Sequence, residues 1–226
     1  MPPAEDQLRG RAAVSGRDIQ RQQTRQRVYT AALAEFKRTG MAAADVGDIV
    51  AAAGVARGTF YFHFPTKEHI LAEFERHEEA RLVAQLAKSL AQLEARCGPS
   101  TGAPGQDFLP AALAEVVRQL TAMERRVGKT LFREMLGLHF SSRRPDLLPD
   151  AGKWTEYPIM TIVVEAIERA RERGEVYDGA DALRTAQFFM LGLYAMLIAS
   201  HDYSKAARAE VLDNFMAIVL RGVESR

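Results

Sequence analysis

The stretch that decides the fold covers residues 45–68 and reads DVGDIVAAAGVARGTFYFHFPTKE. Two acidic side chains, Asp45 and Asp48, stand three residues apart before an apolar run. This acidic variant of the capping box predicts the start of a short helix. Gly54 ends that helix, because a tight turn requires a positive φ that glycine adopts at little steric cost. A second short helix follows until Pro65 stops it. Two short helices around a tight turn have the dimensions of a helix-turn-helix, whose second helix enters the DNA major groove.

A longer helix over residues 19–39 is predicted to precede this pair and to share its core. Val28, Ala32 and Phe36 recur at i, i+4 and i+8 on one face of it, and Gly40 is expected to cap its end. The residues expected to pack with that face are Ile49, Val50, Val55, Phe60 and Phe64.

Residues 1–17 mix Gly, Pro, Ser and Arg without periodicity, which predicts a flexible basic arm. Arg9, Arg11 and Arg17 could follow DNA phosphates, although an ordinary disordered terminus has the same composition. Residues 1–70 hold ten Lys and Arg against seven Asp and Glu, whereas the remainder holds 20 against 22. This modest asymmetry fits a nucleic-acid-facing N-terminus and also fits a merely solvated charge distribution.

The rest of the chain is predicted to be helical, so the expected fold class is all-α. No alternating strand pattern of useful length occurs, and a Gly- and Pro-rich loop is expected at residues 98–105. A single cysteine, Cys97, excludes an internal disulfide framework and a thiolate-only metal cage. We expect a DNA-binding domain over residues 18–66 and a larger helical domain over residues 67–226. The predicted helices of the larger domain cover residues 67–96, 108–122, 125–140, 155–173, 180–200 and 205–223.

Residues 45–68, with the preceding ALAEF of residues 32–36 and Gly40, resemble the signature of the TetR family of transcriptional regulators. The resemblance covers about residues 25–75, and the remainder is similar to the family in length and helical character only. It implies a homodimer that binds double-stranded DNA at a palindromic operator and responds to a small-molecule effector. A repressor released by its effector is the function it implies first.

The resemblance also implies DNA contacts at matching positions. Thr59, Tyr61 and Lys67 match phosphate-contacting sites, and independent chemistry supports two of them. A Tyr hydroxyl can donate to a phosphate, and Lys67 adds charge beside free backbone N–H groups at a helix N-terminus. The full set of expected DNA-binding residues is Arg57, Gly58, Thr59, Tyr61, His63 and Lys67.

Two positions depart from the family pattern. Gly47 has no side chain where family members often carry a longer polar one. The first short helix therefore lacks a side chain at this position that could contact the DNA bases. Glu35 replaces an apolar residue and suggests a pairing with Arg38 or Lys37.

The larger domain is expected to contain an effector pocket and a dimer interface. His139 could orient a polar group of the effector, and a satisfied core histidine is the plainer interpretation. The expected pocket residues are Met123, Phe132, Met135, His139, Trp154, Tyr157 and Met160, which would equally suit an ordinary helical core.

Residues 188–199 are apolar on every face, which predicts a helix buried all round. A monomer of this size would struggle to surround it, so pairing with a second copy is expected, and packing within one chain is the alternative. Gly192 would allow close approach at that interface. The expected interface residues are Phe188, Leu191, Gly192, Met196, Val211, Phe215 and Ile218.

Other functions stay open at this level. A transcriptional activator, or a regulator controlled by a protein partner, would keep the DNA site without the pocket. His69, Glu73 and His77 share one helical face and could hold a metal in an all-α enzyme, although surface charge explains them equally well. No phosphate-binding loop, dinucleotide fingerprint or nucleophile elbow is present, so no cofactor is expected. The N-terminus has no secretory pattern and the longest apolar run is too short to span a membrane, which predicts a cytoplasmic protein.

Overall fold

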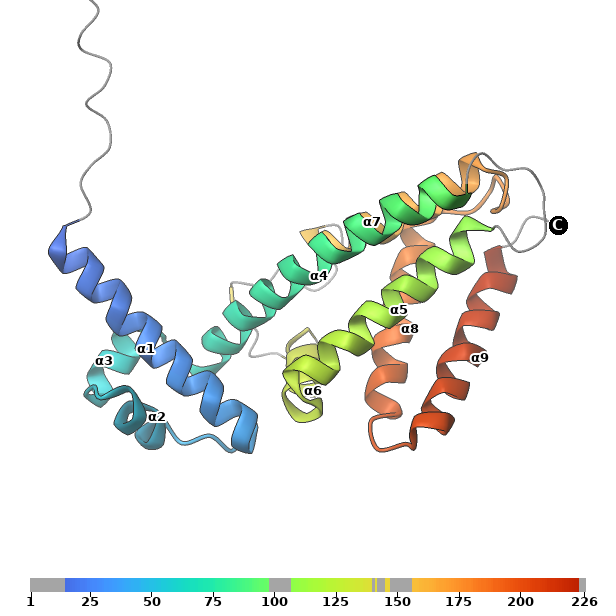
Figure 1. Cartoon of the computed structure of the whole chain (residues 1–226). Helices are drawn as coiled ribbons and strands as arrows, with labels where there is room; N and C mark the ends of the chain where they lie inside the picture. The colour runs from blue at the N-terminus through green and yellow to red at the C-terminus, as the bar shows by residue number, and fades with distance from the viewer. Residues whose placement is uncertain (1–14, 98–106, 140, 142–144, 147–155, 224–226) are drawn as a thin grey trace, which may run out of the picture. The chain divides into compact units, whose positions relative to one another are not determined.

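The computed structural model describes residues 15–97, 107–139, 141, 145–146 and 156–223 (Figure 1). Those residues form nine α-helices and contain no strand. The chain divides into two compact units, Met1–Lys67 and Glu68–Arg226. Each unit is described by itself below.

The first unit contains α1 (Gly16–Thr39), α2 (Val46–Ala53) and α3 (Arg57–His63). The side chain of Ser15 caps α1 by accepting a hydrogen bond from the backbone N–H of Asp18. Because this cap starts the helix at Gly16, the assignment of residues 16 and 17 to the arm is wrong. Residues 1–14 of the predicted arm, Arg9 and Arg11 among them, lie outside the described residues.

Glycines and an aspartate delimit the helices of the first unit as the sequence predicts. Gly40 ends α1 with φ +82°, and Gly54 ends α2 in the left-handed region with φ +63°. The N–H of Val55 then donates to the carbonyl of Val50, which closes the turn. Asp45 caps α2 by accepting from the N–H of Gly47 at 2.5 Å. The cap therefore reaches the second helical position, and α3 begins at Arg57 without a side-chain cap.

The core of the first unit is apolar and centred on α1, which packs against both α2 and α3. Val50 and Val55 are only half-buried, so their predicted place in the core is wrong. α2 turns its Ile49 and Ala53 side inward, and Val55 lies in the turn after α2. The largely or fully buried side chains of this unit are Val28, Tyr29, Ala32, Phe36, Ala44, Ile49, Ala53, Phe60 and Phe64.

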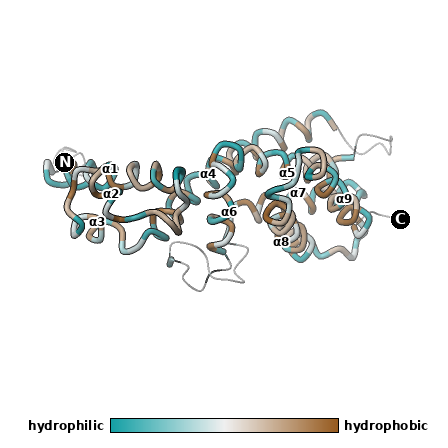
Figure 2. The backbone as a smooth tube through the Cα atoms, turned by 90° about the horizontal axis from the view of Figure 1, so that it is seen from below, coloured by the Kyte–Doolittle hydropathy of each residue, from teal (hydrophilic) through white to brown (hydrophobic). Residues whose placement is uncertain are grey.

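The second unit is built from α4, which begins at the junction of the two units, and five further helices. In Figure 1, α5, α8 and α9 run alongside one another, and α8 packs against α7 and α9. Figure 2 shows hydrophobic and hydrophilic residues interleaved along these helices, as expected when one side of a helix is buried. Their bounds are α4 (Lys67–Cys97), α5 (Phe108–Val127), α6 (Lys129–Leu138), α7 (Pro158–Glu172), α8 (Ala182–Ala199) and α9 (Lys205–Val223).

Three boundaries differ from the sequence prediction for local reasons. The break predicted near residue 123 lies at Gly128, whose φ of +95° ends α5 five residues later than expected. α6 stops at Leu138 rather than residue 140. α7 starts at Pro158, because proline suits the first helical turn, where its missing N–H costs nothing.

α8 is not buried on every side, so that prediction is wrong for the single chain. Phe188 is 65% exposed and Leu191 45% exposed, whereas Phe189, Leu193 and Leu197 are buried. α8 is long and apolar enough to cross a membrane by length and composition, yet 39% of that segment is buried in this fold.

Candidate functional site

α3 presents a short polar and aromatic surface to solvent. Phe60 and Phe64, one turn apart, hold the inner side of the helix in the core. Arg57, Gly58 and Tyr61 are exposed. Of the remaining predicted DNA-binding residues, Thr59 and His63 are half-buried.

Phe62 is the most exposed aromatic residue of α3, and the sequence analysis did not single it out. Its side chain is 66% exposed, and the guanidinium of Arg21 lies 5.0 Å from its ring centroid. Helical phase could have identified it, because burial of Phe60 and Phe64 leaves positions 61 and 62 facing outward. An exposed aromatic ring beside an arginine adds apolar contact area to this surface.

His63 lies close to two arginines, and its charge state follows from them. Partial burial lowers the pKa of His63 below its ordinary value, and the positive charges of Arg21 and Arg25 lower it further. The imidazole is therefore neutral near pH 7. A neutral ring offers one donor and one acceptor rather than a positive charge.

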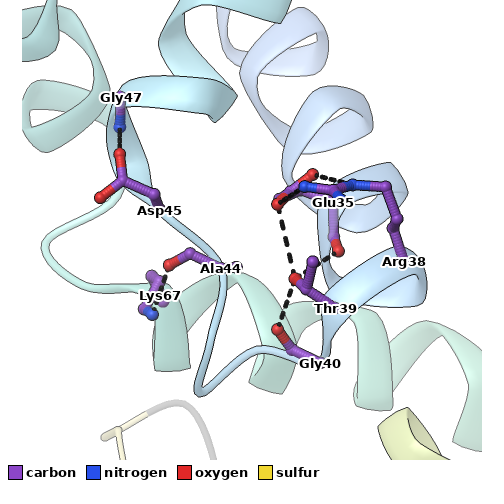
Figure 3. A network of polar contacts seen from close by, with 8 residues as sticks. All are labelled: Glu35, Arg38, Thr39, Gly40, Ala44, Asp45, Gly47 and Lys67. Carbon is purple, nitrogen blue, oxygen red and sulfur yellow. Dashed lines mark hydrogen bonds and ion pairs between the residues drawn. The ribbon is translucent and has the colours of Figure 1, made fainter.

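Lys67 has a structural role that the sequence analysis missed. Its ammonium group donates to the carbonyls of Met41, Ala42 and Ala44 at 2.7, 3.2 and 2.7 Å, all in the segment between α1 and α2. Figure 3 shows Lys67 directed toward Ala44. Three N–H donors are the whole capacity of an ammonium group, so Lys67 positions the start of the helix-turn-helix.

The two departures from the family pattern have physical explanations in the same region. Glu35 pairs with Arg38 through two hydrogen bonds of 2.9 and 2.7 Å, and these bonds lower the pKa of Glu35 (Figure 3). A Cβ on Gly47 would lie 2.6 Å from Oδ1 of Asp45. A side chain at position 47 would therefore displace the cap of α2.

The second unit contains a small internal cavity of about 30 Å³. Of the predicted pocket residues, Met123, Phe132, Met135, His139 and Tyr157 line it. Met160 is buried but does not line the cavity. Trp154 lies outside the described residues. The cavity wall also includes Leu136. It further includes six residues that the sequence did not assign to a pocket, which are Glu75, Glu79, Leu82, Leu120, Ile159 and Tyr194.

A polar cluster occupies one side of this cavity. Nε2 of His139 lies 2.5 Å from Oε1 of Glu75, and Nδ1 lies 3.1 Å from the hydroxyl of Tyr157. Both ring nitrogens of His139 therefore have a partner. Burial raises the pKa of Tyr194, which therefore stays a neutral phenol.

The predicted interface residues of α8 and α9 fall into two groups. Phe188, Leu191 and Ile218 are exposed at 65, 45 and 66%. Gly192 instead faces Phe215 of the same chain, because a Cβ there would lie 2.5 Å from Cε2 of that ring. The close approach that Gly192 allows is therefore between α8 and α9 of one chain, whereas the expected approach was between two copies. Phe215 also stacks on Phe189, and Met196 and Val211 are half-buried.

The face formed by His69, Glu73 and His77 was the candidate metal site. Among the residues that the structure describes, no three His, Cys, Asp or Glu side chains are arranged to hold a metal ion.

Comparison with known proteins finds a family model that matches the helix-turn-helix region. Residues 28–74 match the model of the bacterial regulatory proteins of the tetR family. The HTH-type transcriptional regulator AcrR of Shigella flexneri is 36% identical over 61 residues. That alignment covers 27% of this chain and 28% of AcrR, so the chain matches under a third of the length of this curated relative.

Solved structures match the fold over most of the chain. FadR of Thermus thermophilus, a TetR family repressor solved with lauroyl-CoA, is 23% identical with a TM-score of 0.63. The match covers 89% of this chain and 96% of that protein. FadR of Bacillus subtilis, solved with stearoyl-CoA, is 15% identical with a TM-score of 0.60, covering 88% and 99%. Residues 28–74, which include the helix-turn-helix, are therefore similar to the bacterial regulatory proteins of the tetR family, and the solved structures share the fold of the chain.

Proposed function

We propose that this protein is a cytoplasmic, ligand-responsive transcriptional regulator that represses by binding an operator and leaves the DNA when an effector enters the second unit. The observation that carries the proposal is the tetR-type unit, in which α3 exposes Arg57, Gly58 and Tyr61. The hydroxyl of Tyr61 would donate to a phosphate, and Gly58 would let the backbone approach closely. Thr59 and His63 would contact the DNA at the edges of α3.

Lys67 would act on DNA binding in a different way from the other residues. Because its ammonium group already donates to three carbonyls, its main contribution would be to hold the segment before α2. We therefore assign it a positioning role, with phosphate attraction through its charge as a smaller effect.

A homodimer on a palindromic operator is part of the proposal. The exposed side chains of Phe188, Leu191 and Ile218 support it, because apolar groups of this size are usually covered. A shallow hollow of about 250 Å³ between α8 and α9 adjoins Phe188 and Ile218 and offers a shape that a second copy could fill. A two-fold dimer would present two copies of α3 to half-sites about 34 to 36 Å apart.

Selection of DNA fragments by the purified protein tests the central claim. We expect an enriched palindrome, bound in gel shifts with an affinity that falls steeply with salt, because phosphate contacts dominate binding. Sedimentation of the free protein should report a dimer. Failure to enrich any sequence, or retention of DNA without dependence on salt, would contradict the proposal.

The alternative is a regulator that responds to a protein partner or activates transcription. The small size of the cavity supports this alternative, because about 30 Å³ holds no more than a water-sized molecule. Thermal-shift screening separates the two, because a true effector stabilises the folded protein by mass action. A compound that raises the melting temperature and also releases operator DNA supports the effector-controlled repressor.

A further inference from the structure

The cavity of the second unit contains a carboxylate oxygen with an unmet demand for a hydrogen-bond donor. The side chain of Glu75 is 9% exposed. Its Oε1 contacts His139, whereas its Oε2 is buried and has no hydrogen-bond partner among the residues that the structure describes. A buried carboxylate oxygen without a donor costs free energy, so such groups in proteins normally have partners.

A second carboxyl group lies on the same side of the cavity. Glu79 follows Glu75 by one helical turn on α4, so both side chains project from one face. Burial raises the pKa of Glu79, and the negative charge of Glu75 raises it further. The backbone N–H of Ile159 contacts Oε1 of Glu79 only weakly, at 3.4 Å. His139 and Arg76 oppose this increase without cancelling it, so the two carboxyl groups together form an acidic site.

Several basic groups near the two carboxyl groups already have partners. Both ring nitrogens of His139 have partners, Oε1 of Glu75 and the hydroxyl of Tyr157. Arg126 and Arg81 contact Glu78, the carboxylate between the two in sequence. Among the described residues, no lysine or arginine lines the cavity. A bound molecule with a positively charged N–H group would supply the missing donor.

A large part of the cavity wall is apolar and adaptable. Met123 and Met135 are unbranched side chains that can change conformation to enlarge a small space. The other apolar lining residues are Leu82, Leu120, Phe132 and Leu136. A bound molecule that matched both the acidic and the apolar parts of the lining would combine a positively charged N–H group with an apolar body.

We infer that the effector of this regulator is an amphipathic organic cation whose protonated amine binds between Glu75 and Glu79, with its apolar part against Met123 and Met135. The inference rests on the proposed function and specifies its ligand class. Insertion would push apart side chains on α4, the helix that also begins with Lys67, which gives the effector a means to favour one conformation over another. The anionic acyl-CoA molecules of the two FadR structures belong to those proteins, and a negative group would be repelled by this acidic wall.

Three probes with the same alkyl chain test the charge preference directly. Decylamine, decanol and decanoate are cationic, neutral and anionic near pH 7, because an alkylamine resembles a lysine side chain and an alkanoate a glutamate. Calorimetric titration of the full-length protein, below the concentration at which the probes form micelles, gives their affinities. We expect decylamine to bind at least about tenfold more tightly than decanol, and decanoate to bind most weakly.

Variants of the cavity show whether the preference depends on the two carboxyl groups. Glu75→Gln should lower the affinity for decylamine about 10- to 100-fold and leave the affinity for decanol nearly unchanged, because only the charged hydrogen bond is lost. Glu79→Gln should lower it less, and serves as the second test if Glu75→Gln loses its helical circular dichroism. Glu94→Gln is the matched control on the same helix, since Glu94 is 48% exposed and contacts only Arg169.

Equal affinity for decanol and decylamine, an unchanged affinity in Glu75→Gln, or no binding of any probe because water alone fills the cavity would each overturn the inference. Calorimetry without DNA separates this failure from failure of the proposed function. A protein that binds decylamine but selects no DNA contradicts the regulator. A protein that binds its operator and ignores decylamine contradicts only the cationic effector.

Discussion

The two units of this chain differ most clearly in what they bury. In the described residues, every buried polar or charged side chain lies in the second unit, and they are Glu75, Glu78, Gln119, Glu124 and Ser200. The core of the first unit consists of apolar and aromatic side chains only. Its polar groups, such as Glu35 with Arg38, form pairs near the surface.

This difference indicates that packing alone accounts for the core of the first unit, whereas the second unit keeps buried carboxylates for another reason. Hydrocarbon cores gain stability from burial alone, whereas buried carboxylates need partners and often cost more than they return. Local violations of good packing tend to occur at functional sites. We therefore expect ligand recognition at the buried acids of the second unit. The apolar core of the first unit would instead hold α3 in a fixed position.

Truncation of the aromatic core of the first unit should produce the largest effect. Phe60 is fully buried, so Phe60→Ala should lower the free energy of unfolding by about 3 to 5 kcal/mol. Phe62→Ala, two residues away but 66% exposed, should change it by less than about 0.5 kcal/mol. Urea denaturation followed by circular dichroism measures both. Similar losses in the two variants would contradict the inward orientation of Phe60.

The buried ion pair of the second unit should give the next largest effect. Arg208 Nη2 lies 2.7 Å from Glu124 Oε2, but neither atom has hydrogen-bond geometry with a partner, and Glu124 is 2% exposed. Arg208→Met would leave a buried charge alone and should cost about 3 kcal/mol.

The double variant Arg208→Met with Glu124→Leu separates the cost of leaving a buried charge unpaired from the effect of changed packing. It should recover most of the lost stability, because two apolar side chains replace an imperfect ion pair. Urea denaturation of the two variants and the parent protein forms the test. A double variant no more stable than Arg208→Met would show that the pair itself, rather than the lone charge, stabilises the α5–α9 contact.

The same contrast explains how much of the molecule the sequence reveals. Gly40, Gly54 and Pro65 mark the helix-turn-helix because backbone geometry at these points allows few other residues. Five cavity residues follow from composition and helical phase. Glu75 and Glu79 do not, because an acidic residue on a long helix looks like solvated surface until tertiary packing covers it. Lys67 was assigned to phosphate for the same reason: carbonyls more than twenty residues away leave no local pattern.

Removal of the Tyr61 hydroxyl tests whether α3 of the first unit contacts DNA as proposed. Tyr61→Phe removes one donor from an exposed side chain, so it should weaken operator binding by about 1.5 kcal/mol, or roughly tenfold, without changing stability. Gel shifts at one fixed salt concentration measure the affinity, and sedimentation checks that the dimer is intact. Tyr177→Phe, on a residue with the same 45% exposure in the second unit, is the matched control. Equal affinities for the parent protein and Tyr61→Phe would remove Tyr61 from the proposed contacts.

The smallest expected effect concerns Glu79 and has a definite dependence on pH. The folded-state pKa of Glu79 is raised by burial, then by Glu75, while His139 and Arg76 oppose the increase. A raised carboxyl pKa means that the folded protein binds the proton more tightly than the unfolded chain, so stability falls as pH rises above the ordinary value of 4.5. Glu79→Gln keeps the acceptor for the N–H of Ile159 and removes the buried charge.

This variant should therefore melt about 2 to 4 °C higher than the parent protein near pH 7, and the gain should shrink as the pH is lowered toward 4.5. Calorimetric melting of both proteins across that range, with Glu94→Gln as the exposed control, gives the comparison. A gain of the same size at every pH would mean that the substitution acts through packing rather than charge. A gain that disappears at low pH would show that the second unit retains an acidic group at the expense of its own stability, as expected if that group is kept for binding a cation.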